Sequence, residues 1–317
     1  MKDVLLIAFF ATVSSSRANF LTNEFIQSIN EKQTTWKAGR NFPEDTPIEQ
    51  LRRLNGARSD NLTDVPIKIH VVNPDDIPEF FDSREQWPDC ESIKTIRDQG
   101  QCGSCWAFAA AETITDRQCI ATNGEIEFEF SPEELISCCL DCGDGCDGGY
   151  HYKAFDYWIS EGLVSGGDYD SNEGCQPYVE EAYKKGITPQ CQTQCVSSYD
   201  GTYTQDKHFG LNRYRIDKDV PQIQTEIMTN GPLDGGFAVH DDFFSYKSGV
   251  YQYTSGKFAG SHNVKIVGWG TEDGTPYWLV ANSWGAGWGD LGGFFKILRG
   301  ENHCGIEGDI LAGEPKI

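Results

Sequence analysis

The chain has 317 residues, of which 38% are hydrophobic and 12% aromatic, and its formal net charge is −22. This length and composition suffice for a sizeable core in one or two domains and exclude a disordered protein. Residues 77–317 hold 38 acidic but only 17 basic side chains. The phosphates of a nucleic acid would be repelled by such a surface, so we expect no nucleic-acid partner.

The N-terminus has the pattern of a secretory signal. Lys2 precedes an apolar run of 10 residues, Val4 to Val13, and Ser16-Arg-Ala18 then matches a small-x-small cleavage site. The run is too short to cross a bilayer, and no later segment reaches the roughly 20 apolar residues that a spanning helix needs. We therefore expect residues 1–18 to be a signal peptide. The protein would enter the secretory pathway, have no membrane span, and act in a lysosome or outside the cell.

Residues 19–76 form a distinct polar section without cysteine. The apolar spacing of Phe25, Ile26 and Ile29 predicts a short amphipathic helix. Four prolines predict that most of the remainder is extended, because proline lacks an N–H donor and restricts its predecessor. The sequon Asn61-Leu-Thr63 is a candidate glycosylation site. We interpret this section as an inhibitory propeptide, with an ordinary N-terminal subdomain as the alternative.

From residue 77 the next part of the chain predicts helices. Apolar residues at helical spacing run from Cys105 to Ile120, and Asn123-Gly124 is a stop signal. Ser131-Pro-Glu-Glu134 begins a second helix, with serine as the cap and proline in the first turn. A third helix is expected over residues 150–160, and a short one over residues 221–229.

The C-terminal part predicts strands. β-branched and aromatic residues fill 262–270, 275–281 and 293–299, and Glu272-Asp-Gly-Thr is a turn signal between the first two. Helices followed by strands predict an α+β fold with a cleft between two lobes. We place the helix-rich lobe at roughly 77–185 and the β-rich lobe at roughly 186–317.

The 12 cysteines are consistent with export, because an oxidising compartment favours disulfides. Two Cys-x-x-Cys pairs, Cys102/Cys105 and Cys139/Cys142, offer an alternative zinc or thiol-redox site. The separation of the two pairs is larger than in common zinc modules. We therefore expect neither a metal nor another cofactor.

Three residues in chain order could perform nucleophilic catalysis. Cys105 opens the first predicted helix, and a helix N-terminus lowers the pKa of a thiol. His262 could hold the proton that the thiol loses and deliver it to a leaving amine. Asn282 could fix the tautomer of the imidazole.

Gln99 lies six residues before Cys105. With the Cys105 backbone N–H it could donate hydrogen bonds to a tetrahedral oxyanion. A histidine at the start of a strand can also be purely structural. Four other histidines are rival bases, but none stands about 20 residues before an Asn-Ser-Trp strand as His262 does: His151, His208, His240 and His303.

The motif Cys102-Gly-Ser-Cys105-Trp resembles the local signature of papain-like thiol proteases. The resemblance runs from about Phe25 to the C-terminus and is strongest to the cathepsin B branch. It rests on long segments such as Phe81-Asp-Ser-Arg-Glu-Gln-Trp87, Cys142-Gly-Asp-Gly-Cys-Asp-Gly-Gly-Tyr150 and His303-Cys-Gly-Ile-Glu307. It implies a papain-like two-lobe fold, with a helical left lobe and a β-barrel-like right lobe.

The resemblance also implies a disulfide pairing that spacing alone does not give. The implied bridges are Cys90–Cys119, Cys102–Cys146, Cys138–Cys191, Cys139–Cys142 and Cys175–Cys195. Cys105 and Cys304 remain unpaired, and Cys105 is the implied nucleophile. The substrate-binding residues implied by position are Gly148, Gly149, Tyr150, His151, Gly236, Asn263, Trp284 and Asp309.

The chain departs from the cathepsin B pattern in three places. The segment between Cys175 and Cys191 is short and lacks the histidine pair that, in this branch, captures a substrate's C-terminal carboxylate. Asn263 replaces the usual alanine after the catalytic histidine. Asp309 replaces a longer glutamate at the base of the pocket for the second residue upstream of the cut. We expect arginine there, paired with Asp309 in a two-pronged fork.

The sequence therefore predicts a cathepsin B-like cysteine endopeptidase that is made as a zymogen and forms a thioester acyl-enzyme. Its shortened occluding loop predicts little peptidyl-dipeptidase activity. The expected partners are protein and peptide substrates, cystatin-type inhibitors and its own propeptide. A non-enzymatic homologue that binds peptides in the same cleft is the rival hypothesis, and the intact Gln99, Cys105, His262 and Asn282 argue against it.

Overall fold

A computed structural model describes residues 19–33, 35–59 and 62–317. The expected signal peptide and the sequon residue Asn61 lie outside these ranges. Within the described residues, no helix has the length and apolar composition that crossing a membrane requires.

The main helices follow local signals in the sequence. Ser131 caps its helix, with Oγ accepting a hydrogen bond from Glu134 N at 3.0 Å, and proline is in the first turn. Asn123 and Gly124 both have positive φ where the longest helix ends. The α-helices are α1 (Asn23–Lys32), α2 (Ile48–Arg53), α3 (Ser83–Gln86), α4 (Cys105–Ala121), α5 (Pro132–Cys138), α6 (His151–Ser160), α7 (Glu180–Tyr183) and α8 (Val220–Asn230).

The strands form one open sheet with the order β1-β6-β9-β8-β7-β5-β10-β4-β2, and β3 pairs with β7 outside this path. The two-lobe α+β fold is confirmed, but the sheet does not close into a barrel. Asp273 and Gly274 have positive φ at the predicted turn between β7 and β8. The strands are β1 (Trp36–Ala38), β2 (Ile67–Lys68), β3 (Phe81–Asp82), β4 (Gly210–Ile216), β5 (Leu233–His240), β6 (Tyr246–Tyr251), β7 (Phe258–Glu272), β8 (Thr275–Ala281), β9 (Phe294–Leu298) and β10 (Ile310–Pro315).

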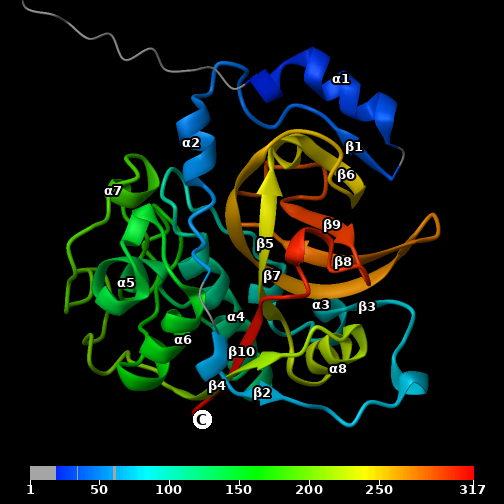
Figure 1. Ribbon diagram of the computed structural model, residues 1–317. Helices are drawn as coiled ribbons and strands as arrows, with labels where there is room; N and C mark the ends of the chain where they lie inside the picture. The colour runs from blue at the N-terminus through cyan, green and yellow to red at the C-terminus, as the bar shows by residue number, and fades with distance from the viewer. Residues whose placement is uncertain (1–18, 34, 60–61) are drawn as a thin grey trace, which may run out of the picture.

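Helix α4 lies between the two lobes (Figure 1). It contacts α5 and α6 on one side and β7 and β10 on the other. Every residue from Cys105 to Cys119 is buried, so the helix has no solvent-facing stripe. The sequence predicted that one face of this helix is buried. The opposite face of the helix is buried as well, because the sheet covers it.

The N-terminal section runs over the sheet lobe and then down between the lobes (Figure 1). Strand β1 pairs with β6, and Trp36 packs against Tyr246 and Tyr251 with ring centroids 6.1 and 5.2 Å apart. Helix α2 was not predicted, because we expected extended chain around the prolines. Pro47 instead stands directly before the helix, a position where its missing N–H costs nothing.

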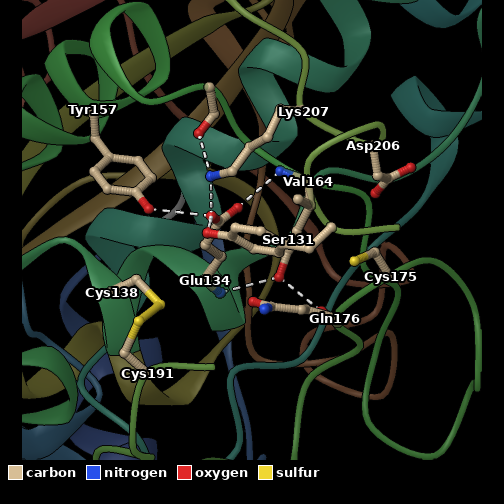
Figure 2. Close-up of polar contacts among 12 residues, drawn as sticks. Ser131, Glu134, Cys138, Tyr157, Val164, Cys175, Gln176, Cys191, Asp206 and Lys207 are labelled. Atoms are coloured by element: carbon tan, nitrogen blue, oxygen red, sulfur yellow. Dashed lines mark hydrogen bonds and ion pairs between the residues drawn. A yellow bond between two sulfur atoms is a disulfide. The ribbon is translucent and has the colours of Figure 1, made fainter. Parts of the chain in front are cut away.

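The chain stays with the helical lobe through His208, beyond the boundary expected near residue 186. His208 exchanges two backbone hydrogen bonds with Leu163. The buried Glu134 carboxylate on α5 accepts hydrogen bonds from Lys207, from Tyr203 Oη at 2.5 Å and from Val164 N at 2.8 Å (Figure 2). The crossing to the sheet lobe therefore comes with β4.

A buried ionic cluster joins the lobes behind the cleft. Lys265 of β7 is 1% exposed, and its Nζ lies 2.9 Å from Asp116 Oδ2 and 3.6 Å from Glu112 Oε2 of α4. Nζ also donates to Ser92 O at 3.2 Å. Burial lowers the pKa of Lys265, but the two carboxylates outweigh it and raise that pKa, so the amine stays charged.

We predict that Lys265→Ala destabilises the protein by about 3–5 kcal/mol, because it removes the nearest cation from the buried Asp116 carboxylate and from Glu112, whose pKa burial raises to about 8. Lys94→Ala is the matched control. It breaks the exposed Lys94–Glu91 pair, whose side chains are 39% and 68% exposed, and should cost less than about 1 kcal/mol. Denaturant unfolding of both variants in a Cys105→Ala background measures the difference. Equal midpoints would contradict a structural role for the cluster.

Candidate active site

The predicted nucleophile, base and orienting amide lie on three elements, of which α4 and β7 pack against each other and β7 pairs with β8. Cys105 is the first residue of α4, His262 lies in β7, and Asn282 directly follows β8. His262 Nε2 is 2.8 Å from Asn282 Oδ1, so the amide oxygen accepts the ring proton. His262 Nδ1 has no hydrogen-bond partner in the described part of the chain.

Trp284 covers the bond between the histidine and the asparagine. Its ring lies 4.8 Å from the His262 ring and stacks on Phe244 at 5.5 Å. Trp284 is 8% exposed, so little water reaches the hydrogen bond beneath it. Exclusion of water strengthens that bond and restricts rotation of the imidazole.

Gln99 is fully buried with its side-chain amide locked in one orientation. Its Oε1 accepts a hydrogen bond from Ser283 Oγ at 2.7 Å, and its Nε2 donates to Cys102 O at 2.7 Å. Nε2 also donates to Leu54 O at 3.0 Å. The Leu54 carbonyl therefore occupies the place that we expected for an oxyanion. Sequence reasoning missed Ser283, whose role depends on a contact across 184 residues.

Residues 54–58 follow the cleft as a bound strand. Gly149 N donates to Gly56 O at 2.9 Å, Arg58 N donates to Gly149 O at 2.9 Å, and Ala57 N donates to Ser261 O at 3.1 Å. The bridge between Ala57 and Gly149 is parallel. Arg58 is held further by Asp144 Oδ2 at 2.6 Å.

The two candidate glycines of the cleft have no room for side chains. A Cβ on Gly148, whose φ is +103°, would lie 2.7 Å from Gly56 O. A Cβ on Gly149 would lie 2.5 Å from the Trp106 ring. Glycine is therefore required where another backbone approaches this closely.

The covered cleft favours the neutral forms of the catalytic pair. Cys105 and His262 are both 0% exposed. Burial raises the pKa of the Cys105 thiol to about 11, against a smaller lowering by the backbone N–H groups of Asn263 and Gly56. Burial also lowers the pKa of His262 to about 4. A thiol and a neutral imidazole are thus present together at neutral pH, and the nucleophilic thiolate is scarce.

The remaining candidate pocket residues lie beside the catalytic pair. Tyr150 caps the N-terminus of α6 and is half-buried, and His151 follows as the first helical residue. Gly236 of β5 pairs with Asn263 of β7. A Cβ on Gly236 would lie 2.7 Å from Asp309 Oδ2, so Asp309 stands over this glycine.

The five disulfides among the described residues join the same ten cysteines in the same pairs that the resemblance implied. Cys105 and Cys304 are free. Three of the four cysteines in the alternative zinc site are bound in disulfides, so that site does not form. The bridges are Cys90–Cys119, Cys102–Cys146, Cys138–Cys191, Cys139–Cys142 and Cys175–Cys195.

The short segment between Cys175 and Cys191 is fixed at both ends. Ser131 Oγ donates to Gln176 O at 2.7 Å, and the Cys138–Cys191 bridge ties its far end to α5 (Figure 2). Its middle carries α7, where Tyr183 O accepts from Gln101 N at 2.8 Å. Tyr183 and Lys184 line a cavity of about 250 Å³ that also includes Leu51 and Leu54.

Comparison with known proteins shows similarity along the whole chain. Residues 77–313 match the model of papain family cysteine proteases, and residues 21–61 match the peptidase family C1 propeptide. Two relatives come from Caenorhabditis elegans. A gut-specific cysteine proteinase is 52% identical over 98% of this chain and 96% of its own length. Cathepsin B-like cysteine proteinase 4 is 44% identical over the full length of both chains.

A solved structure, proCathepsin B S9 from Trypanosoma congolense, is similar with a TM-score of 0.84 and 36% identity. The similarity covers 95% of this chain and 99% of that one. The segment seated in the cleft, residues 54–58, falls within the stretch that matches the C1 propeptide.

We predict that Gly56→Ala opens the cleft of the uncleaved chain. A Cβ on Gly56 would lie 1.8 Å from Gly103 O, and neither backbone can yield without losing hydrogen bonds. An overpacking cost of about 1–3 kcal/mol should speed the labelling of Cys105 by an epoxide reagent roughly 10- to 100-fold. Gly287→Ala is the control, because a Cβ there meets nothing within 4 Å. Unchanged labelling of the Gly56 variant would show that this contact does not hold the segment down.

Proposed function

The chain belongs to the papain family of cysteine proteases and is a cathepsin B-like protease made as a proenzyme. We propose that it is an endopeptidase that cleaves peptide bonds through a thioester, with Cys105 as nucleophile and His262 as proton carrier. We propose further that residues 19–76 are released on activation and that the enzyme works in a lysosome or outside the cell.

One observation supports these roles best. The Leu54 carbonyl oxygen accepts the Gln99 Nε2 hydrogen bond at 3.0 Å, and the backbone N–H of Gly56, two residues later, bonds to the buried Cys105 thiol. The Leu54 carbonyl oxygen therefore marks the position at which a substrate carbonyl oxygen would become negatively charged. A donor fixed in advance by Ser283 pays no reorganisation cost when that charge develops.

Peptide hydrolysis then proceeds in two steps. The Cys105 thiolate attacks the substrate carbonyl carbon, and Gln99 Nε2 with the Cys105 backbone N–H binds the resulting oxyanion. The intermediate collapses to a thioester as the C–N bond breaks and His262 protonates the departing amine. His262 next takes a proton from water, which attacks the thioester; the C–S bond breaks, the thiolate is restored, and the new carboxylic acid loses its proton to solvent.

Release of the propeptide restores the reactive, ionised form of the Cys105 thiol. In the proenzyme, burial beneath Leu54 and Gly56 favours a neutral thiol and imidazole. When solvent enters, the desolvation penalty falls, while the N-terminus of the 17-residue helix α4 still favours negative charge on sulfur. The thiolate–imidazolium pair then becomes the stable form.

The structure of the short segment between Cys175 and Cys191 supports internal cleavage. Its two cations have other partners: Lys184 Nζ lies over the Tyr169 ring at 5.0 Å, and Lys185 Nζ lies 3.8 Å from Glu181. Neither is placed as a fixed trap for a C-terminal carboxylate. The primed side would then accept long chains and also cystatin-type inhibitors.

We predict that Cys105→Ala or His262→Ala lowers kcat/KM for peptide substrates by at least about 10³-fold, because each removes an atom that takes part in bond changes. Asn282→Ala should cost less, because Asn282 orients the ring and takes no proton. Thermal unfolding midpoints within about 3 °C of the parent would exclude misfolding. Near-parental turnover by either of the first two variants would refute the assignment.

We predict similar kcat/KM for an internally quenched peptide with a free C-terminal carboxylate and for the same peptide with an amidated C-terminus. In the described segment between Cys175 and Cys191, both cations already have other partners and neither is held for a terminal carboxylate. The double variant Lys184→Ala/Lys185→Ala controls for the two exposed cations and should leave the ratio near one. A strong preference for the free carboxylate, with release of dipeptides, would contradict endopeptidase action.

We predict that acid loosens the end of the propeptide that carries β2. Lys68 Nζ bonds to Glu314 Oε1 at 2.9 Å, and this bond lowers the pKa of Glu314. Burial raises the pKa of Glu226, but Arg117, Tyr214 and Lys68 lower it overall. Since both folded pKa values are depressed, the stabilisation is complete above the ordinary glutamate value of about 4.3 and is lost below it.

Hydrogen exchange of the β2 backbone in the Cys105→Ala proenzyme measures this loosening. Protection should fall below about pH 4.5, after correction for intrinsic exchange rates. Lys68→Gln should reduce protection at neutral pH and flatten the pH response. Constant protection down to pH 3.5 would contradict the role of these carboxylates.

A further inference from the structure

Strands of the N-terminal section form both ends of the sheet. Strand β1 pairs with β6 at one end, and β2 pairs with β4 at the other (Figure 1). If residues 19–76 leave on activation, β4 becomes an edge strand of the activated enzyme. An edge strand presents unpaired backbone N–H and C=O groups, which can pair with another extended chain.

The residues that hold β2 against β4 form a site that binds backbone. Arg215 N donates to Pro66 O at 2.9 Å. The Gln222 amide binds both backbone groups of His70: its Oε1 accepts from His70 N at 2.7 Å, and its Nε2 donates to His70 O at 3.0 Å. These contacts use backbone atoms alone, so an extended chain of another sequence can make them. We call this surface of β4, α8 and β10 the edge site, and its residues are Tyr214, Arg215, Gln222, Glu226 and Glu314.

The edge site also holds one cation. Lys68 Nζ lies 2.9 Å from Glu314 Oε1 and 3.7 Å from Glu226 Oε2. It donates a hydrogen bond to Tyr214 Oη at 3.1 Å and lies 4.3 Å from the centroid of the Tyr214 ring. Two carboxylates, a hydroxyl oxygen and a ring face therefore surround a single ammonium group. Such surroundings favour lysine at this position of a bound strand.

Contacts within the sheet lobe and α4 keep the Glu226 carboxylate in place without β2. Glu226 is 0% exposed, and its Oε1 accepts from Arg117 Nη2 at 2.9 Å and from Tyr214 Oη at 2.7 Å. Among the described residues, its Oε2 has only Lys68 and His70 as partners, with His70 Nε2 2.6 Å away. Removal of β2 would take both partners from this oxygen, and a bound cation would restore them.

The bound segment presents alternate side chains to the edge site. The side chains of Lys68 and His70 are 27% and 13% exposed, whereas Ile67 and Ile69 are 43% and 67% exposed. Side chains two residues apart share one face of an extended chain. The edge site therefore selects a lysine and a second hydrogen-bond donor two residues later, and it leaves the residues on either side of the lysine at the surface.

We propose that the edge site of the activated enzyme is an exosite for protein substrates: it binds an extended segment that carries lysine and, two residues later, histidine. This inference rests on the proposed function and narrows its substrate class to proteins with such a segment away from the cut. Arg58 lies in the cleft, and Val65, seven residues later, bonds through its carbonyl to Arg215 Nε at 3.3 Å. One polypeptide can therefore occupy the cleft and the edge site together.

Binding is measured first, on enzyme that is activated from the full chain and then blocked at Cys105 with the epoxide reagent. Mass spectrometry shows whether residues 62–76 are gone. An activated enzyme that retains them would overturn the proposal, because the edge site would stay filled. The probe is a fluorescent peptide of residues 62–73, followed by its anisotropy at neutral pH. We expect a Kd of about 100 μM, because a short strand makes few contacts and loses chain entropy.

Variants of the peptide and of the enzyme test which contacts matter. Lys68→Gln or His70→Gln in the peptide should weaken binding about tenfold, since each removes a bond to a carboxylate. Gln222→Ala or Glu314→Gln in the enzyme should weaken it about fivefold or more. Glu125→Gln is the matched control, because it removes the same charge from an exposed position in the helical lobe and should leave the Kd unchanged.

Use of the exosite by a substrate is measured with fluorogenic peptides that share one cleavage sequence. One carries Pro-Ile-Lys-Ile-His beyond a flexible linker of about 12 residues, and its partner carries Pro-Ile-Gln-Ile-Gln there. Both are made with the segment at either end. An effective concentration of about 1 mM and a Kd of about 100 μM predict roughly tenfold higher kcat/KM for the lysine peptide in at least one arrangement. Gln222→Ala should remove this gain and leave kcat/KM for the peptide without a segment within about twofold.

The outcomes separate the exosite from the proposed function. An unblocked enzyme that hydrolyses none of the peptides would overturn the proposed function, whereas the binding measurement needs no catalysis. Equal binding of the parent and Lys68→Gln peptides would overturn the exosite alone, and so would the absence of a kcat/KM gain in both arrangements. The peptide variants need no change in the enzyme, so they decide the question even if Gln222→Ala does not fold.

Discussion

The catalytic pair is divided between two lobes, and the junction between those lobes is the constraint on which the site depends. Cys105 begins a helix that is buried on all sides, and His262 lies on the strand that packs against it. Lys265, three residues after His262, crosses from the same strand to the carboxylates of Asp116 and Glu112 on that helix. A charged amine in a dry interface tolerates little displacement, because separation from Asp116 takes the buried amine and the buried carboxylate away from their nearest partners. The same contact that joins the lobes therefore sets the register of the thiol against the imidazole.

Inhibition by the N-terminal section follows from desolvation as well as from steric blocking. The Leu54 carbonyl binds the Gln99 amide, and Gly56 lies so close to Gly103 that no side chain would fit. Water is excluded from Cys105 and His262, and both groups favour their neutral forms. Two causes would therefore keep the proenzyme inactive. The substrate site is occupied, and the nucleophile is in its unreactive protonation state.

Features that depend on local signals could be predicted from the sequence. The caps at Ser131 and at Asn123-Gly124, and the turn at Asp273-Gly274, mark helix and strand ends that the structure contains. His262 and Asn282 are hydrogen-bonded to each other, and Cys105 begins the helix that packs against the strand of His262. Contacts between residues that are far apart in the sequence could not be predicted in this way. His151 is hydrogen-bonded to Asp234 and Asp309, which lie 83 and 158 residues away, and no periodicity links them. Helix α2 was missed because we interpreted its proline as a sign of extended chain, although proline also favours the start of a helix.

The protonation state of Cys105 before and after activation distinguishes desolvation from steric blocking. Ultraviolet absorbance of the thiolate, followed against pH in the parent chain with the absorbance of a Cys105→Ala chain subtracted, measures it in both forms. The Cys105 thiol of the uncleaved chain should stay protonated up to about pH 10, with a pKa of about 11. After removal of the propeptide, the same thiol should titrate well below the ordinary value of about 8.5. The same low pKa in both forms would contradict desolvation as a cause of inhibition and leave steric blocking alone.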